Sequence, residues 1–271
     1  MPVFALGHQT ITRVAAFGEF LRFTGQAVTE VVVSPHRWGR RSVFLPLLYF
    51  IGTTSIPVIA LTGAFIGAIL AVEGFDQFAA FGLESRLGTA VNISLVKQIG
   101  PVLAAVMLAG RVGCALAAEL GSMRVTDQLD AIRVLGASPI RVLVTPRVVA
   151  CVLMIPVLTV VSNLMGVAGA WLSLVPVAGV DNDAYWQFSR GFINWFDIAN
   201  GLIKSVFFGF AIGIIACYKG FNCKPGAVGV GKATTDAFVT SFIAIVIINF
   251  VLAKFLNDLA AISEVAAQRF L

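Results

Sequence analysis

Two long stretches without a charged residue place the strongest constraint on this chain. No Asp, Glu, Lys or Arg occurs between Arg41 and Glu73, a run of 31 residues, or between Arg147 and Asp181, a run of 33 residues. About 20 apolar residues in a helix are enough to cross the hydrocarbon core of a bilayer. Only 12% of the 271 residues are charged and 58% are hydrophobic, whereas soluble domains carry about 25% charged residues. The sequence therefore predicts membrane-spanning helices and excludes a soluble fold.

Three further apolar segments complete a set of five predicted spans. They cover about residues 87–118, 198–218 and 237–255, with Lys97, Arg111 and Lys204 inside them. We expect an all-α integral membrane protein with a five-span domain over residues 44–258 and a tail over 259–271, because lipid-exposed backbone must be hydrogen-bonded within its own segment. Gly63 and Gly67 have the spacing that permits close helix packing. Since the number of spans is odd, the two ends lie on opposite sides of the membrane.

Residues 14–33 are apolar but contain too many charges to cross a bilayer. When they are projected at 100° per residue, the polar side chains share an arc of about 80° and the large apolar ones lie opposite. The polar set is Glu19, Arg22, Gln26 and Glu30, and the apolar set is Phe17, Phe20, Leu21, Val28 and Val31. We expect an interfacial amphipathic helix ended by Ser34 and Pro35, within an N-terminal region of residues 1–43. The first 20 residues lack the pattern of a signal peptide.

The distribution of basic residues predicts which side of the membrane each loop faces. Segment 1–43 and the loops after spans two and four hold 12 of the 19 basic residues and six acids, whereas the other side holds four basic residues and eight acids. Basic residues concentrate in cytoplasmic loops. The amino terminus is therefore expected in the cytoplasm and the carboxyl terminus outside. The net charge of +5 is interpreted as a topology signal rather than as a sign of nucleic-acid binding.

The sequence offers little chemistry for catalysis or for metal binding. Its four Cys and two His residues have no metal-ligand spacing, and no catalytic triad, HExxH motif or pair of intramembrane carboxylates is present. Residues 226–233 match a phosphate-binding loop except that Ala233 replaces the hydroxyl residue that would hold Mg²⁺. A short connection between two spans lacks the strand and helix that this motif requires. We therefore expect no metal, cofactor or nucleotide in this chain, and interpret the segment as a cytoplasmic turn before span five.

Residues 119–139 combine charged and apolar side chains at helical spacing. Thr126 is expected to cap the start of this helix, and Gly136 and Pro139 to end it. The pattern alone is compatible with an ordinary loop helix or with a helix that docks on a soluble partner.

The run from Gly110 to Ala131 resembles the hallmark segment of MlaE-type permeases. These proteins are the membrane subunits of ABC transporters that move phospholipids or other lipids between bacterial membranes, with relatives in plastids. The resemblance extends over about residues 12–258. Further matching segments occur in order at residues 63–67, 100–101, 146–147, 202–205 and 231–235.

The resemblance implies that residues 119–139 form a coupling helix seated in a cleft of a separate cytoplasmic ATPase, which would bind ATP and Mg²⁺. The candidate contacts are Glu119, Gly121, Met123, Thr126, Asp127, Gln128 and Asp130. Many relatives carry Glu at position 127. The resemblance also implies an extracytoplasmic MCE-domain partner, a small STAS-type accessory protein, and a bacterial inner membrane location with a periplasmic carboxyl terminus. Five spans without internal duplication are expected to form half of a transporter, closed by a second copy of the chain.

Three cations are predicted inside the membrane, where an unpaired charge costs several kcal/mol. Arg111 lies near the cytoplasmic boundary, where its side chain can reach water. Lys97 and Lys204 lie deeper, with no acid at similar depth in the predicted spans. They are expected either to line a hydrated cavity or contact a lipid phosphate, or to pair with backbone carbonyls. MlaE relatives of the best-known type carry a basic-acidic pair at positions 97 and 98 and an acid at 249. Here Gln98 and Asn249 replace the acids, which suggests a more cationic cavity.

Apolar side chains near the outer ends of spans one and two are candidates for a lipid-chain pocket, with an interfacial aromatic belt or ordinary core packing as the alternative. With the polar candidates, the predicted lipid-binding set is Val72, Phe75, Phe78, Phe81, Lys97, Gln98, Lys204 and Asn249.

The sequence is compatible with three function classes to different degrees. The resemblance favours a non-catalytic lipid permease of an ABC transporter. A membrane-embedded lipid-modifying enzyme is disfavoured because no catalytic constellation is present, and a passive channel or scaffold is disfavoured by the coupling-helix resemblance.

Overall fold

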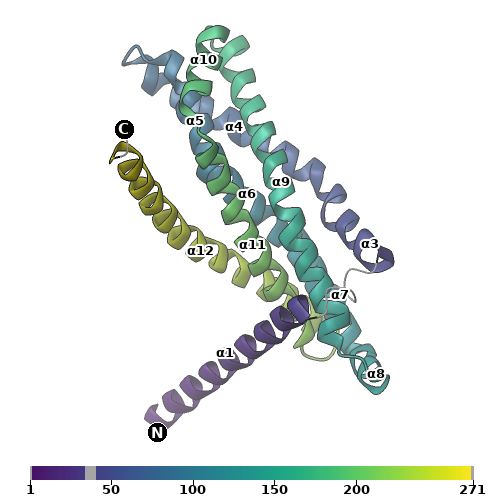
Figure 1. The fold of residues 1–271 in the computed structure, drawn as a ribbon. Coiled ribbons are helices and arrows are strands. Elements are labelled where there is room, and N and C mark those ends of the chain that lie inside the picture. Colours follow the sequence, from purple (N-terminus) through teal and green to yellow (C-terminus); the bar gives the residue numbers. More distant parts are fainter. Residues whose placement is uncertain (1, 34–40, 270–271) are drawn as a thin grey trace.

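The computed structural model describes residues 2–33 and 41–269, and all regular structure within those ranges is helical. Figure 1 shows a bundle of long helices, with α1 (Pro2–Val33) leaving obliquely at one end and α12 (Ala227–Arg269) diverging from the bundle toward its own end. Five segments are long and apolar enough to cross a membrane: Ser42–Ala79, Glu84–Val125, Ile140–Val177, Trp195–Phe221 and Ala227–Leu259. The five-span prediction is confirmed.

Most spans are composed of several consecutive helical pieces. The first contains α3 (Arg41–Ile51), the turn η1 (Thr53–Ser55) and α4 (Ile56–Ala79). The second contains α5 (Glu84–Ser94), η2 (Leu95–Ile99), α6 (Gly100–Leu108), η3 (Ala109–Gly113) and α7 (Cys114–Val125). The third contains η4 (Ile140–Val144), α9 (Thr145–Leu172) and η5 (Ser173–Val177), and the fourth is α11 (Trp195–Phe221). Four of the short pieces, η2, η3, η4 and η5, are π-helical, a geometry that is frequent at functional sites.

Glycines allow α4 and α9 to touch backbone to backbone. A Cβ atom added to Gly67 would overlap the carbonyl group of Gly166, and one added to Gly169 would overlap the carbonyl of Ala64. A Cβ on Gly63 would lie 2.5 Å from the carbonyl oxygen of Ser162. Small residues at these positions therefore permit the close approach that the spacing of Gly63 and Gly67 predicts.

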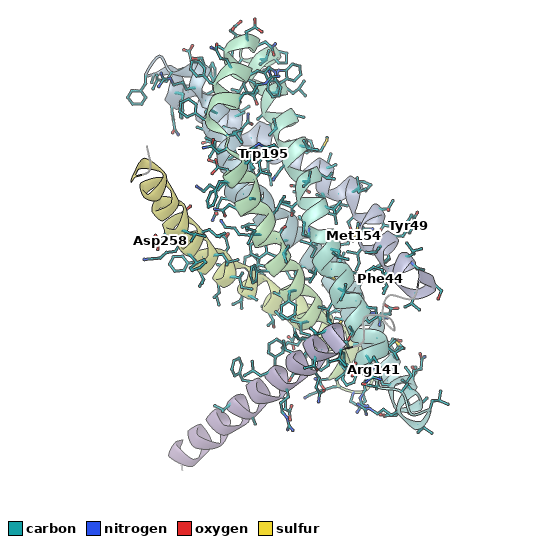
Figure 2. All side chains as sticks on the ribbon, in the orientation of Figure 1. Phe44, Tyr49, Arg141, Met154, Trp195 and Asp258 are labelled. Atoms are coloured by element: carbon teal, nitrogen blue, oxygen red, sulfur yellow. The ribbon has the colours of Figure 1, made fainter. Side chains whose placement is uncertain are left out.

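The helix predicted over residues 14–33 is part of the longer α1, which ends at Val33. The rings of Phe20 and Phe23 pack edge-on against Tyr218, with centroids 5.1 and 5.4 Å apart. Arg141 Nε and Nη2 donate to the Glu30 carboxylate at 2.7 and 2.8 Å, and Arg141 lies where α1 meets the bundle (Figure 2). Phe17, Leu21 and Val28 on the apolar face are exposed. This exposure is compatible with a helix lying on the membrane surface, and the interfacial position of α1 stays a prediction. Ser34 and Pro35 lie outside the described residues.

The sequence did not predict α10 (Asn182–Phe192), which connects spans three and four. Asp181 caps this helix by accepting a hydrogen bond from the backbone N–H of Ala184 at 2.8 Å. The buried hydroxyl of Tyr185 accepts from Asn92 Nδ2 of α5 at 2.9 Å, and the same amide donates to Ser189 Oγ at 3.1 Å. This buried network holds α10 on the end of span two.

The last helix is the least buried of the five spans. Only 17% of its most apolar 18-residue stretch is buried, compared with 67% for the corresponding stretch of α11. α12 begins at Ala227, directly after Gly226 with its positive φ of 89°. The glycine-rich segment at 226–233 was interpreted as a turn before span five, but from Ala227 onward it is already helical and forms the start of that span. It forms no strand-to-helix loop.

Candidate functional site

The segment predicted as one coupling helix over residues 119–139 is two helices joined by a turn, so that prediction was wrong in this detail. α7 ends at Val125, and α8 covers Gln128–Val134. Asp127 between them has a left-handed φ of 56°, a conformation in which Asp is one of the few tolerated side chains. Thr126 was expected to cap the helix start, but it does not cap α8. Its hydroxyl donates back to the Ser122 carbonyl of α7 at 2.9 Å. Gly136, with a φ of 75°, ends α8 as predicted.

The candidate docking residues divide into an inward group and an outward group. Gly121 is buried against Cys223 and Val230, and Met123 packs on the core beneath α1. Asp130 accepts ion pairs from Arg124 at 3.1 Å and Arg133 at 2.6 Å. Thr126, Asp127 and Gln128 are exposed at the turn, and Glu119 is exposed on α7.

Glu119 has a partner that the sequence did not reveal. Its carboxylate lies 3.0 Å from Nη2 of Arg147, whose side chain is only 7% exposed. This ion pair joins α7 to the start of α9, so the end of span two is tied to span three directly behind the candidate coupling segment.

An apolar tip on α8 was missed. Val134 and Leu135 are 88% and 83% exposed, whereas Leu129 near the start of α8 is completely buried. The amphipathic pattern of residues 119–139 did not indicate which apolar side chains would be exposed, and α8 ends at Val134, directly before Leu135. The signal available in the sequence was the apolar pair directly before Gly136. Exposed apolar side chains beside charged ones are typical of surfaces that bind another protein.

Inside the membrane, the structure brings Lys97, Gln98 and Lys204 together. The Lys204 side chain is buried, with 1% exposed. Its ammonium donates to Gln98 Oε1 at 2.6 Å and to the Lys97 carbonyl oxygen at 3.3 Å. Of the two alternatives for Lys204, the structure therefore supports pairing with a backbone carbonyl. The π-helical η2, which contains Lys97 and Gln98, supplies both acceptors.

The expectation that no acid lies at the depth of Lys97 was wrong. Lys97 Nζ lies 3.5 Å from Asp197 Oδ1. The sequence placed the start of span four at residue 198, but α11 begins at Trp195, because Asn194 and Asp197 form a capping box. With two ammonium groups and one carboxylate, the cluster of Lys97, Lys204 and Asp197 carries a net charge of +1.

The remaining lipid-binding candidates do not join this cluster. Asn249 lies on α12, and its side-chain oxygen is buried with no hydrogen-bond partner among the residues that the structure covers. Phe75 and Phe78 pack on the core around Tyr185 and Leu87, in keeping with the core-packing alternative. Val72 and Phe81 are exposed by 62% and 80%.

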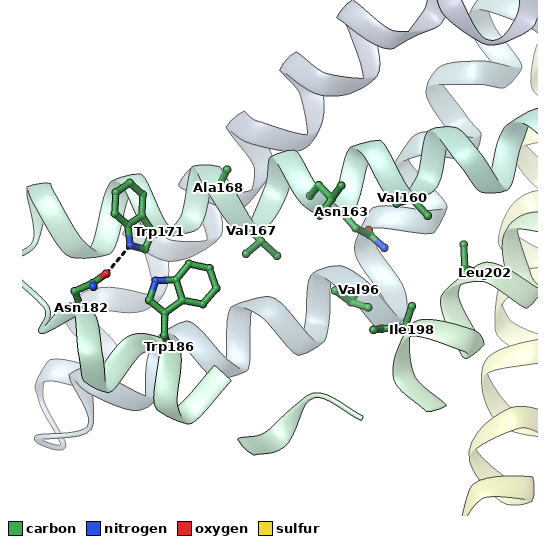
Figure 3. A pocket seen from close by; sticks show the side chains of 11 residues that line it. Val96, Val160, Asn163, Val167, Ala168, Trp171, Asn182, Trp186, Ile198 and Leu202 are labelled. Carbon is green, nitrogen blue, oxygen red and sulfur yellow. Dashed lines mark hydrogen bonds between the residues drawn. The ribbon is translucent and has the colours of Figure 1, made fainter. Parts of the chain in front are cut away.

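A separate apolar cavity of about 750 Å³ opens between α9, α10, α11 and η2. Figure 3 shows Trp171 and Trp186 at one end and Val160 and Leu202 toward the other. None of the predicted lipid-binding residues lines it. Within the described ranges, no group of three or more His, Cys, Asp or Glu side chains has a geometry that could hold a metal ion.

Comparison with known proteins identifies the family. The profile of the family described as Permease MlaE matches residues 44–255, which contain all of spans two to four and most of spans one and five. The chain belongs to the MlaE permease family. A probable ABC transporter permease protein of Rickettsia felis is 40% identical over 250 residues, covering 92% of this chain and 95% of the relative. The MlaE permease of Haemophilus influenzae, named for an intermembrane phospholipid transport system, is 34% identical and covers 92% of this chain and 94% of its own length.

A plant protein also matches this MlaE family member. The chloroplastic protein TRIGALACTOSYLDIACYLGLYCEROL 1 of Arabidopsis thaliana is 36% identical over 231 residues, covering 85% of this chain and 65% of the relative. The chain is thus a multi-pass membrane protein of a family whose bacterial members are named as ABC transporter permeases.

Proposed function

We propose that this chain is the membrane-spanning permease subunit of an ABC transporter that moves phospholipids or related lipids. The lipids pass between the bacterial inner membrane and an extracytoplasmic MCE-domain partner, and a separate cytoplasmic ATPase hydrolyses ATP with Mg²⁺. The name of the Haemophilus relative supports the substrate class. The observation that carries the proposal is the apolar tip of α8, since Val134 and Leu135 are almost fully exposed beside charged side chains.

The coupling segment acts as the mechanical link to the ATPase. Its exposed turn at residues 126–128 and its tip at Val134 and Leu135 are the surfaces that enter the ATPase cleft. α7 is the last part of span two, and the Glu119–Arg147 ion pair ties it to span three. A displacement of the segment therefore reaches two spans together, as the rigid-body transitions of transporters require.

The functional unit contains two copies of the chain, with the poorly buried face of α12 available for closure. A small STAS-type accessory protein completes the cytoplasmic side. The amino terminus lies in the cytoplasm and the carboxyl terminus in the periplasm, as the basic residues indicate. The chain itself binds no nucleic acid and catalyses no reaction.

Lipid translocation uses the candidate set around the outer ends of the spans and the polar cluster. Lys97 is the best placed of these residues to meet a lipid phosphate, because its side chain is 32% exposed. Gln98 and Lys204 hold the helix segment that presents Lys97. Val72, Phe75, Phe78, Phe81 and Asn249 are proposed to contact lipid chains.

The test is affinity purification in mild detergent, with identification of the subunits and lipids that remain bound. The informative variant carries V134D and L135D, and the control is V228D, because Val228 is also 88% exposed and lies on the same predicted side of the membrane. We expect wild type and control to retain an ATPase and phospholipid, and the double variant to lose the ATPase while keeping its yield and its lipid.

Other outcomes contradict the proposal in distinguishable ways. A wild-type preparation with neither ATPase nor lipid argues against any lipid permease. Chemically altered lipid without an ATPase favours the lipid-modifying enzyme, and lipid or ion movement that is independent of ATP favours a channel. An ATPase retained equally by the double variant and the control removes α8 from the docking surface.

A further inference from the structure

The cavity between α9, α10, α11 and η2 is a groove whose depth corresponds to one leaflet of a bilayer. Its lining on α9 forms one helical stripe from Val160 to Trp171, a rise of about 16 Å at 1.5 Å per residue. Half of a hydrocarbon core of about 30 Å is about 15 Å. Val160 lies near the middle of the third span, Ile140–Val177. The groove therefore begins near the membrane midplane and ends near the surface on the side of α10.

The chemistry of the groove matches a hydrocarbon chain. Apart from the amides of Asn163 and Asn182, all its lining residues are apolar or aromatic. Its volume of about 750 Å³ lies within the range of about 300–1,000 Å³ that is usual for small-molecule sites. Leu164 and Val160 in the lining are 65% and 40% exposed, so the groove opens sideways toward the surrounding lipid.

The outer end of the groove has the features of a membrane surface. Trp171 Nε1–H donates to Asn182 Oδ1 at 3.0 Å, which closes the end between α9 and α10. Trp186 lies beside it (Figure 3), and tryptophan is enriched at the level of lipid headgroups. The guanidinium carbon of Arg190 lies 6.0 Å from the centroid of the Trp186 ring. A cation that matches phosphate geometry thus lies next to the mouth of an apolar groove.

We propose that this groove binds one phospholipid of the leaflet next to α10, with an acyl chain along α9 and the phosphate beside Arg190. The site is separate from the Lys97 cluster and does not depend on the proposed transport function. A transmembrane helix of a partner is a poorer occupant, because it would pack along a face that spans both leaflets, whereas the groove ends near the midplane.

The test uses the full-length chain in phospholipid vesicles that contain phosphatidylethanolamine with a photoreactive diazirine in one acyl chain. After illumination, the labelled peptides are located by mass spectrometry. We expect adducts on residues 160–171 and 198–202. V167W fills the groove, since Val167 points into it (Figure 3), and should reduce these adducts to the background of other lipid-facing helices. M165W is the matched control, because Met165 is on the same helix at similar depth, is 38% exposed, and does not line the groove.

A second variant tests the phosphate contact without altering the cavity. In wild type, phosphatidylethanolamine should label the groove more strongly than a diacylglycerol with the same labelled chain, and R190Q should abolish that difference. Equal labelling by the two probes in wild type, or equal labelling of V167W and M165W, would overturn the proposal. Loss of groove labelling when the chain is purified together with its native partners would assign the groove to a protein helix and overturn it as well. Persistence of the labelling in that preparation supports it.

Discussion

Replacing Gln98 with Leu should destabilise the protein, because it removes the closest hydrogen-bond acceptor of a buried ammonium group. Lys204 is 1% exposed, and Gln98 Oε1 lies 2.6 Å from its Nζ. Loss of a partner from a buried charge costs about 3–5 kcal/mol, whereas a hydrogen bond to a charged group contributes about 1.5–3 kcal/mol. The Lys97 carbonyl, at 3.3 Å, remains as an acceptor in the variant. We therefore expect Q98L to lower the free energy of unfolding by about 1.5–3 kcal/mol.

The double variant Q98L/K204M distinguishes this cause from a simple packing defect. When both partners are replaced by apolar groups, no buried charge is left without its acceptor, and the net cost is close to zero. The double variant should therefore be more stable than Q98L alone, with a coupling energy of about 1.5–3 kcal/mol in the mutant cycle. Q98E is the control, because it keeps an acceptor at the same position and should be at least as stable as wild type.

The free energies can be measured by unfolding the protein in mixed micelles of dodecyl maltoside with increasing dodecyl sulfate, followed by tryptophan fluorescence. A double variant that is no more stable than Q98L would refute the reasoning. It would mean that Lys204 obtains its stabilisation from groups other than Gln98.

Two further predictions concern helix packing and pH. G67A should lower the thermal stability in detergent by the equivalent of about 1–3 kcal/mol, because its methyl group would overlap the Gly166 carbonyl. The control is G18A, where the new Cβ meets nothing within 4 Å. G18A should stabilise the exposed part of α1 by about 0.5–1 kcal/mol. Equal effects of the two would contradict the close contact. Burial raises the pKa of Tyr185, and its hydrogen bond with Asn92 opposes the rise. The folded state then favours the neutral phenol, so this contribution to stability is complete below about pH 10 and is lost as the pH rises through the raised pKa. Thermal unfolding followed from about pH 8 to about pH 11 should show this alkaline loss in wild type and a smaller one in Y185F; parallel curves would exclude Tyr185 as its source.

The sequence predicted the elements whose signal lies in contiguous residues. Uncharged runs identified spans one and three, and largely apolar segments with one or two charges identified the other three, because a charge is costly in hydrocarbon wherever the rest of the fold lies. The left-handed Asp127 that divides the coupling segment has no comparable signal, since one Asp within an amphipathic pattern does not by itself distinguish a break from a helix start. Asp197 was assigned to the wrong side of a boundary because its capping role extends α11 beyond the apolar run.

Contacts between residues far apart in the chain could not be predicted from the sequence. Lys204 and Gln98 are separated by 106 positions, and nothing in the local pattern of either indicates the other. The same holds for the Glu119–Arg147 pair and for the network between Asn92 and Tyr185. In each case periodicity can place a polar residue on a helix face, but only the packing of helices decides whether a buried charge meets water, lipid or a partner.

The glycine contacts between α4 and α9 determine which parts of the permease can move relative to each other. Where two backbones touch, no side chains lie between them that could change rotamer, and sliding by even a fraction of a helical turn would bring carbonyl groups into collision. We therefore expect spans one and three to travel as one rigid body through any transport cycle. We then expect relative motion to occur at α12, which is the least buried of the five spans. A disulfide across α4 and α9 should leave turnover intact, whereas one that fixes α12 to α11 should stop it.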